Sequence, residues 1–203
     1  SRASQYKDNA NRNTLQATSR NLDDYLTSLG MEISFAPFDQ IGRSRITQLV
    51  NKSNQFNLTT RRYTEFEIQA FEEAPDYFSL QVRLSDVFGD NGMISVIICR
   101  QDEKKAEWHI DTWLMSCRVL KRQVEDSVLK ILVEQAHNRK ILRITGQYIP
   151  TGRNELVKDH YSKLGFKLIE TSDDGSSYWS LSIDEYTAPS IPMKVVSGNF
   201  KQI

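Results

Sequence analysis

The sequence predicts an α/β domain built on a mixed, mostly antiparallel sheet with helices on both faces. Residues 78–84 alternate between apolar and polar side chains, which is the period of a half-buried strand. Residues 88–92 hold the glycines and the asparagine that a hairpin loop needs. From residue 124 to residue 132 the period changes, because apolar side chains recur at the spacing of one helical face. A meander of strands followed by alternating helices and strands is typical of this fold class.

The N-terminal part of the chain leads into this sheet. Residues 1–30 are polar at first and then show the apolar spacing of a helix, with Gly30 where a C-terminal cap belongs. We interpret these residues as a linker and a connecting helix from a missing N-terminal domain. A short alternating strand is predicted at residues 31–35.

Two helices are expected before the strands of the meander. The first is predicted at residues 39–50, with Ile41 in its buried stripe. The second begins at Thr64, because Thr64 and Glu67 are three residues apart and can each satisfy a free backbone donor in a capping box.

The rest of the chain completes the sheet, and its elements follow from the same patterns. They are strands at residues 94–99 and 108–115, a helix from residue 124, a strand at 141–145, a helix at 153–164, and a hairpin at 167–170 and 178–183. The predicted order is β-α-α-β-β-β-α-β-α-β-β. The domain is expected to span residues 31–186, with an irregular tail at residues 187–203.

Composition excludes several classes of function. Lysine plus arginine and aspartate plus glutamate both number 26 in 203 residues, so no overall field draws the chain to nucleic acid or to an anionic membrane. No apolar run approaches the roughly 20 residues of a membrane span, and no signal peptide is visible. Cys99 and Cys117 fit neither a disulfide framework nor a metal-ligand spacing, so we expect a cytoplasmic protein with no metal in this segment. Cys117 is expected to be a buried, inert thiol.

The most informative pattern is the turn that leads from the strand at residues 108–115 into the next helix. A helix that begins directly after a central strand can point its free backbone N–H groups at a phosphate. Arg118 opens this turn, and Lys121 and Arg122 add positive charge. However, Lys121 and Gln123 stand where small residues would let the backbone approach a ligand. The alternative is a plain strand-to-helix turn with solvated basic side chains.

A second pattern lies in the helix predicted at residues 153–164. Asn154 and Tyr161 are seven residues apart, so two turns of a helix would point them the same way. Gly165 and Phe166 then close the helix. Alternatively, Asn154 caps this helix and Tyr161 is a core aromatic with its hydroxyl at the surface.

The turn and this helix together resemble the GNAT family of N-acetyltransferases. In that family the turn reads Gln/Arg-x-x-Gly-x-Gly/Ala and the helix reads Asn-x-x-small-x-x-x-Tyr-x-x-x-Gly-Phe. The resemblance implies a cofactor, acyl-coenzyme A or a phosphopantetheine thioester, held in a gap between splayed strands. It implies that Tyr161 is the general acid for the departing thiolate. It also implies a set of cofactor-binding residues: Arg118, Val119, Lys121, Arg122, Gln123 and Asn154.

The strand before the turn contributes a candidate general base. His109, Asp111 and Trp113 alternate along it and are expected to share one face. A carboxylate and an imidazole beside an aromatic side chain could remove a proton directly or through water, so Asp111 and His109 are candidate catalytic residues. In the alternative, this face packs against a helix and Asp111 is hydrogen-bonded there. His160 is expected to be solvated.

Three longer runs resemble FkbH-like proteins: residues 45–61, 86–92 and 108–120. Such proteins join an N-terminal haloacid-dehalogenase-type (HAD) domain, which binds Mg²⁺ and carries phosphatase and transfer chemistry, to a C-terminal GNAT-like domain. They are associated with making glyceryl-acyl carrier protein, the precursor of methoxymalonyl extender units for polyketides. The resemblance implies that this chain is the C-terminal part. It also implies that its partners are an acyl carrier protein and a missing HAD-type domain, which holds the metal site.

The loop at residues 51–62 is expected to border the acceptor side of the cleft, as the corresponding loop does in GNAT folds. The resemblance therefore implies a set of polar substrate-binding residues: Asn54, Gln55, Asn57, Thr59 and Arg61. In the alternative, the loop is held by its own side-chain-to-backbone hydrogen bonds, for which Asn and Thr are well suited.

Two functions follow from these patterns. In the first, the domain is an acyltransferase that acts on acyl or glyceryl thioesters of coenzyme A or an acyl carrier protein. In the second, it is a non-catalytic module that binds the carrier protein or its phosphopantetheine arm on behalf of the missing HAD-type domain. The retained Asn154 and Tyr161 favour the first, and the replaced glycines favour the second. Nothing specific in the sequence supports a purely structural role.

Overall fold

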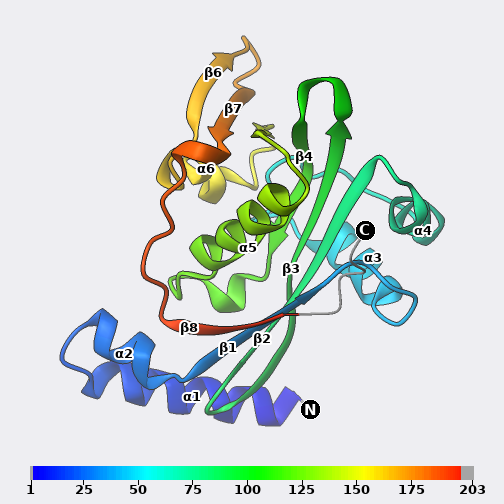
Figure 1. Cartoon of the computed structure of the whole chain (residues 1–203). Helices are drawn as coiled ribbons and strands as arrows, with labels where there is room; N and C mark the ends of the chain where they lie inside the picture. The colour runs from blue at the N-terminus through cyan, green and yellow to red at the C-terminus, as the bar shows by residue number, and fades with distance from the viewer. Residues whose placement is uncertain (1, 198–203) are drawn as a thin grey trace.

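The computed structural model describes residues 2–197, so residues 198–203 of the expected tail lie outside the described part of the chain. These residues form one eight-stranded sheet with the order β6-β7-β5-β4-β3-β2-β1-β8. Neighbouring strands are antiparallel except in the β4–β5 and β1–β8 pairs. Helices cover both faces of the sheet (Figure 1), and the predicted fold class is confirmed.

The order of the elements from β1 to β7 also agrees with the predicted order. The strands are β1 (Met31–Ala36), β2 (Tyr77–Asp86), β3 (Gly89–Asp102), β4 (Glu107–Met115), β5 (Arg143–Tyr148), β6 (Lys167–Thr171), β7 (Ser177–Ser182) and β8 (Met193–Ser197). The α-helices are α1 (Arg2–Thr18), α2 (Leu22–Ser28), α3 (Arg43–Lys52), α4 (Glu65–Glu73), α5 (Val124–Asn138) and α6 (His160–Lys163). Short 3₁₀ turns lie at Glu103–Lys105, Cys117–Val119, Glu155–Val157 and Ile183–Glu185.

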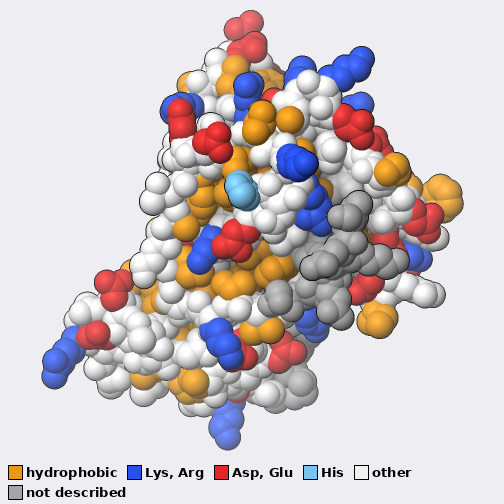
Figure 2. Space-filling view, in the orientation of Figure 1, with side chains coloured by type: hydrophobic (Ala, Val, Ile, Leu, Met, Phe, Trp, Pro, Cys, Tyr) orange, Lys and Arg blue, Asp and Glu red, His pale blue; other side chains and the backbone are white. Residues whose placement is uncertain are grey.

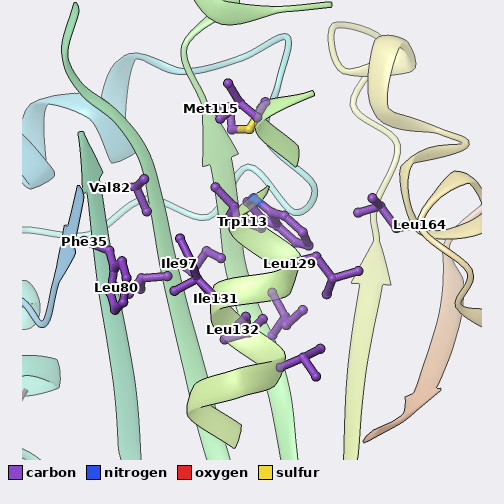
Figure 3. Close-up of a cluster of buried hydrophobic side chains, with 14 of the residues drawn as sticks. Phe35, Leu80, Val82, Ile97, Trp113, Met115, Leu129, Ile131, Leu132 and Leu164 are labelled. Carbon is purple, nitrogen blue, oxygen red and sulfur yellow. The ribbon is translucent and has the colours of Figure 1, made fainter. Parts of the chain in front are cut away.

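The central strands are buried on both faces, although the alternation in β2 predicts a half-buried strand. Side chains of the strands and of α5 point toward one another in the larger apolar core (Figure 3). A smaller core lies under α3 and α4. The polar side chains of β2 are accommodated there by backbone groups: Phe38 N–H donates to Ser79 Oγ (3.1 Å), and Gln81 Nε2 donates to the Pro37 carbonyl (2.9 Å).

β4 and β5 are neighbours along only part of their length. Residues 107–110 of β4 pair in parallel with residues 143–146 of β5, and the pairing ends at Ile110 and Gly146. At the same level, the register between β4 and β3 shifts, which leaves Asp111 as an extra residue in the ladder. Such a bulge bends a strand and increases its twist. The sheet therefore splits between β4 and β5, as the sequence resemblance implies.

The prediction of one continuous helix at residues 153–164 is wrong. The chain forms a 3₁₀ turn at Glu155–Val157 and only four helical residues in α6. The side chain of Asn154 explains the change, because it accepts from Thr151 N–H (2.9 Å) and makes no cap to the following turn. Asn154 and Tyr161 therefore do not share a helix face.

A buried ion-pair cluster joins α1 to the turn before α5. The side chain of Asp86, at the end of β2, is fully buried and accepts from Arg12 in α1 (2.8 Å) and from Arg122 (3.2 Å). Asn91 Nδ2 and Phe88 N–H also donate to Asp86. Burial works to raise the pKa of Asp86, but the bonds from Arg12 and Phe88 outweigh it and lower that pKa.

Two details at the edges of elements differ from prediction. Ile41 is 94% exposed, because α3 begins only at Arg43 and Ile41 lies in the preceding turn. The tail expected to be irregular contains β8, which pairs in parallel with β1. By contrast, the capping box of Thr64 and Glu67 is confirmed at the start of α4.

The molecular surface carries charges of both signs. On the face shown in Figure 2, basic and acidic side chains are interspersed.

No helix in residues 2–197 has both the length and the apolar character needed to cross a membrane.

Candidate functional site

The gap between β4 and β5 is filled by the chain itself. Residues 56–59, here called the inserted segment, run along β4 beyond the point where β5 diverges. Leu58 N–H donates to the Trp113 carbonyl (3.1 Å), and Met115 N–H donates to the Phe56 carbonyl (3.1 Å). These two bonds form the pattern of an antiparallel pair. The inserted segment therefore occupies the β4 edge that the split in the sheet would leave open.

The opposite side of the inserted segment is bonded to the end of β5. Ile149 N–H donates to the Leu58 carbonyl (2.9 Å). Asn154 Nδ2 donates both to the Asn57 carbonyl (2.9 Å) and to the Ile149 carbonyl (2.9 Å). Asn154, which the resemblance assigns to a cofactor, thus connects the inserted segment to β5. It is fully buried in this role.

All side chains of the inserted segment are buried. Their exposed fractions are 4% for Phe56, 0% for Asn57, 0% for Leu58 and 6% for Thr59. Asn57 Oδ1 accepts from Thr60 N–H (2.9 Å), and Thr59 Oγ1 donates to the Asp111 carbonyl (2.9 Å). The polar groups expected to bind a substrate at Asn57 and Thr59 are therefore used within the protein.

The flanking loop residues are also engaged with the chain. Asn54 Oδ1 accepts from the Arg62 guanidinium, and Gln55 Oε1 accepts from Cys117 Sγ (3.3 Å). Both contacts join side chains, and Gln55 reaches outside the loop; the side-chain-to-backbone bonds of the alternative are formed by Asn57, with the Ser53 carbonyl and Thr60 N–H. Cys117 is exposed rather than buried, because it opens the 3₁₀ turn after β4. It lines a pocket of about 620 Å³ beside Gln55 and Arg153.

The turn at residues 118–123 keeps the backbone shape that small residues would favour. Lys121 (φ 64°) and Gln123 (φ 58°) both lie in the left-handed region, where a side chain costs about 1 kcal/mol or more relative to glycine. Val119 is fully buried. The Arg118 guanidinium donates to the Asn91 carbonyl in β3 (3.4 Å), so it extends toward the β2–β3 hairpin.

The first turn of α5 carries two acidic residues, Glu125 and Asp126. Burial raises the pKa values of Glu125 and Asp126, although backbone N–H groups of the first turn interact with both carboxylates and oppose this shift. Arg122 is turned away to Asp86. An anionic ligand at this helix terminus would meet two carboxylates where the resemblance implies free N–H groups.

Tyr161 lies inside the core. It is 1% exposed, and its ring fills the space beside Gly146, where an added Cβ would lie 2.3 Å from the Tyr161 hydroxyl. Burial, and then the neighbouring Cys99, raises the pKa of Tyr161 well above its ordinary value. Within the described residues the hydroxyl has no hydrogen-bond partner. The expectation that it reaches the surface is wrong.

Two further polar groups without partners surround Tyr161, and the sequence patterns missed them. Trp113 Nε1 and His160 Nε2 are buried and have no partner among residues 2–197. The His160 ring lies edge-on to Trp113 (4.4 Å between centroids) and to Phe56 of the inserted segment (5.2 Å). A histidine in a polar run gives no sign of burial in the sequence, which is why His160 was expected to be solvated.

The expected face of His109, Asp111 and Trp113 does not form. The bulge at Asp111 changes the alternation, so that Trp113 joins the core under α5, while Asp111 is bonded by Arg61 and by Tyr63 Oη (2.7 Å). This carboxylate is thus hydrogen-bonded, as the alternative for Asp111 proposes, but its partners lie in the segment before α4 and not on a helix.

Among the described residues, His109 forms no hydrogen bond with Asp111 or Arg61 and contacts β5 instead. Its Nδ1 lies 3.1 Å from Thr145 Oγ1 on β5. Burial, followed by the charge of Arg61, lowers the pKa of His109, and the carboxylate of Asp111 opposes this shift. The ring is therefore held close to the level at which β4 and β5 separate.

The buried His160 predicts a pH dependence of stability. Burial, and then the charge of Lys163, lowers its pKa from 6.5 to about 3 in the folded protein. Between these values the unfolded chain binds more protons, so stability decreases as the pH falls through this window. The slope from this one group is at most about 1.4 kcal/mol per pH unit. Urea unfolding at several pH values between 4 and 7 measures it.

The matched variants for this measurement are His160→Gln and His137→Gln. His137 is exposed on α5, so its replacement should leave the slope of the wild-type protein unchanged. Replacement of His160 should reduce the slope. Equal slopes in all three proteins would contradict the buried, neutral state of His160.

The acyl-coenzyme A implied by the resemblance does not fit this arrangement. Its slender arm would need the β4 edge that Phe56 and Leu58 occupy. Its phosphates would need the start of α5, which carries Glu125 and Asp126. The inserted segment thus occupies the first part of the implied site, whereas a pocket of about 620 Å³ lies at the second, lined by residues that include Lys121, Gln123 and Glu125.

Comparison with known proteins supports the fold. No protein-family model matches the chain, and no curated protein matches it. Among solved structures, the ribosomal-protein-S18-alanine N-acetyltransferase from Escherichia coli has a TM-score of 0.56 and 12% identity, covering 74% of this chain and 94% of that one. The GNAT domain of S. lividans PAT has a TM-score of 0.56 and 14% identity, with coverage of 73% and 89%.

A third structure contains a cofactor. Spermidine N-acetyltransferase from Vibrio cholerae, in complex with CoA and spermine, has a TM-score of 0.60 and 9% identity, covering 75% of this chain and 96% of that one. At these identities the likeness concerns the fold alone. The chain therefore has the fold of the GNAT acetyltransferases.

Proposed function

We propose that this domain is a non-catalytic module that binds an acyl carrier protein for a HAD-type domain of the same FkbH-like polypeptide. The observation that carries this proposal is the inserted segment, which uses the β4 edge for Leu58 N–H and the Phe56 carbonyl. In a GNAT fold closed in this way, Phe56 and Leu58 take the backbone hydrogen bonds of β4 that a thioester arm would need, and the outer surface stays available for a partner.

The partner and pathway in this proposal come from sequence resemblance. Residues 45–61, 86–92 and 108–120 resemble FkbH-like proteins, which are associated with glyceryl- and methoxymalonyl-acyl carrier protein in polyketide biosynthesis. The first of these runs contains the inserted segment, and the third contains Trp113, to which that segment is bonded. The proposed module acts in the cytoplasm, where carrier protein and HAD-type domain would meet.

A second function is favoured by the buried polar groups around Tyr161. Trp113 Nε1, His160 Nε2 and the Tyr161 hydroxyl have no partners in the described residues, and Phe56 lies against His160. Unpaired buried polar groups cost free energy, and withdrawal of the inserted segment would open a path toward them. In that state the domain would be an acyltransferase, with the Tyr161 O–H placed to donate a proton.

Calorimetric titration separates the two functions. Acetyl-coenzyme A, an apo carrier protein and the same carrier protein with its phosphopantetheine arm are titrated into the domain. The module is expected to bind both carrier forms with equal affinity, because Phe56 and Leu58 take the backbone hydrogen bonds of β4 that the arm would need, and to give no heat with acetyl-coenzyme A. Absence of binding to either carrier form would contradict the module.

Tyr161→Phe provides the matched variant. It removes only the buried hydroxyl, and for the module we expect unchanged carrier binding and a free energy of unfolding that is unchanged or higher, since an unpaired buried hydroxyl is lost. Binding of acetyl-coenzyme A with thioester turnover that Tyr161→Phe abolishes would instead select the acyltransferase.

A further inference from the structure

Three arginines meet at a pocket on the α3 side of the sheet. The pocket has a volume of about 700 Å³ and lies between the start of α3, strands β1 and β2, and the beginning of β3. Arg45 comes from α3, Arg83 from β2, and Arg118 from the turn after β4. All three side chains belong to exposed residues. Three elements that are distant in sequence thus bring like charges to one concave surface.

None of these arginines is neutralised by a carboxylate within ion-pair distance in residues 2–197. Arg45 donates to Gln48 Oε1, and Arg118 donates to Ser116 Oγ (3.2 Å) and to a backbone carbonyl. Arg83 makes no side-chain hydrogen bond in the described part of the chain. Five other arginines are ion-paired: Arg12, Arg43, Arg61, Arg122 and Arg143.

The guanidinium groups are close enough to affect one another. Burial first, and then the charges of Arg118 and Arg83, lower the pKa of Arg45. Such mutual repulsion costs free energy that a bound anion would remove. The position of the three charges is therefore unfavourable in the empty protein and favourable in a complex with an anion.

The two acidic residues of the pocket accept hydrogen bonds from backbone N–H groups. Asp39 Oδ1 accepts from Gly42 N–H (2.6 Å) before α3, and Asp90 Oδ1 accepts from Gly92 N–H (2.6 Å) in the β2–β3 hairpin. Each closes a local turn, and neither is within ion-pair distance of the three arginines. The two carboxylates lower the net charge of the pocket, so the ligand must gain its affinity from directed bonds to the guanidinium groups.

We propose that this pocket binds a small ligand that carries a phosphate group, held by Arg45, Arg83 and Arg118. Guanidinium groups match phosphate oxygens with paired, charge-assisted hydrogen bonds. The volume lies within the range of small-molecule sites. The site is separate from the gap between β4 and β5 and goes beyond the proposed function, because it needs neither a thioester nor the carrier protein.

Titration of inorganic pyrophosphate into the full chain, followed by calorimetry at low ionic strength, tests this site. Loss of one charged hydrogen-bond donor should weaken binding about tenfold, so we expect that effect in Arg83→Gln. Arg83 is exposed and has no partner to lose, and thermal unfolding of the variant should match the wild type. Arg20→Gln, an exposed arginine between α1 and α2, makes the same charge change and should bind normally.

Three results would overturn the proposal. The first is no binding of pyrophosphate by the wild-type chain. The second is equal weakening by Arg83→Gln and Arg20→Gln, which would reflect overall charge alone. The third is an Arg83→Gln variant that keeps pyrophosphate binding and loses only carrier-protein binding, which would assign the arginines to a protein interface. Because acetyl-coenzyme A also carries a pyrophosphate and Arg118 also lines the pocket at the turn before α5, it is the weakening by Arg83→Gln that assigns binding to this pocket, and unchanged binding in that variant would also overturn the proposal.

Discussion

Replacement of Asp86 by alanine is expected to lower the free energy of unfolding by about 3–5 kcal/mol, the cost of breaking a buried ion pair from one side. The Asp86 side chain is fully buried, and its two partners, Arg12 and Arg122, are 6% and 9% exposed. Without the carboxylate, two buried guanidinium groups lie beside each other unpaired. The packing of α1 and the turn before α5 both depend on this residue. Urea unfolding followed by circular dichroism measures the change.

Asp102→Ala is the matched control for this experiment. Asp102 forms an ion pair with Lys105 whose side chains are 44% and 70% exposed, and it accepts from Lys105 N–H (3.3 Å), so its replacement should cost about 1–2 kcal/mol at most. A change at Asp86 as small as that at Asp102 would show that α1 is not anchored through the buried cluster. It would then also follow that Arg122 is free to turn toward a ligand at the start of α5.

Replacement of Asn154 by alanine is expected to cost about 3 kcal/mol or more, because each buried group that loses its partner costs about 1–3 kcal/mol. Asn154 donates to the Asn57 and Ile149 carbonyls and accepts from Thr151 N–H. The first of these bonds holds the inserted segment and the second holds the chain after β5. Both unfolding free energy and amide exchange at Leu58 measure the effect.

The variant Asn154→Asp distinguishes the hydrogen bond that Asn154 accepts from the two that it donates. An aspartate keeps an acceptor for Thr151 N–H but cannot donate to the two carbonyls. We expect it to destabilise the inserted segment nearly as much as alanine does. A stable Asn154→Asp protein with unchanged exchange at Leu58 would mean that the donated bonds do not hold the segment.

The sequence predicts the elements well because their signals are local. The alternation in β2, the capping box at Thr64 and the apolar face of α5 are each set by residues within a few positions. The order of those elements then leads to the GNAT-like sheet, and even the split between β4 and β5 follows from that fold. The left-handed backbone of Lys121 and Gln123 was not predicted, because their residue types favour no such conformation.

The sequence could not predict that residues 56–59 fill the split between β4 and β5, because their position depends on contacts between residues that are distant in the chain. The bonds of Leu58 to Trp113 and to Ile149 join positions that lie far apart in the chain, and no local pattern signals them. Polar residues such as Asn57 and Thr59 resemble a solvated loop in the sequence, yet they are buried in the sheet. The polar-apolar-polar alternation of Asn57, Leu58 and Thr59 is the one weak signal of a short strand.

The predicted arrangement of the candidate catalytic residues was wrong for a related reason. A single bulge at Asp111 changes which face every later residue of β4 presents, and bulges leave no clear mark in the sequence. Similarly, seven-residue spacing places Asn154 and Tyr161 together only if the helix between them is continuous. The side chain of Asn154 bonds backward to Thr151 instead.

The most direct test of the account is amide hydrogen exchange at Leu58, Met115 and Ile149, with and without acetyl-coenzyme A. Their N–H groups form the bonds on the two sides of the inserted segment. We predict exchange as slow as that of the central strand β3, unchanged by acetyl-coenzyme A. Rapid exchange at these three amides, or a change in their exchange when acetyl-coenzyme A is added, would show that the gap opens to a thioester arm and would contradict the account.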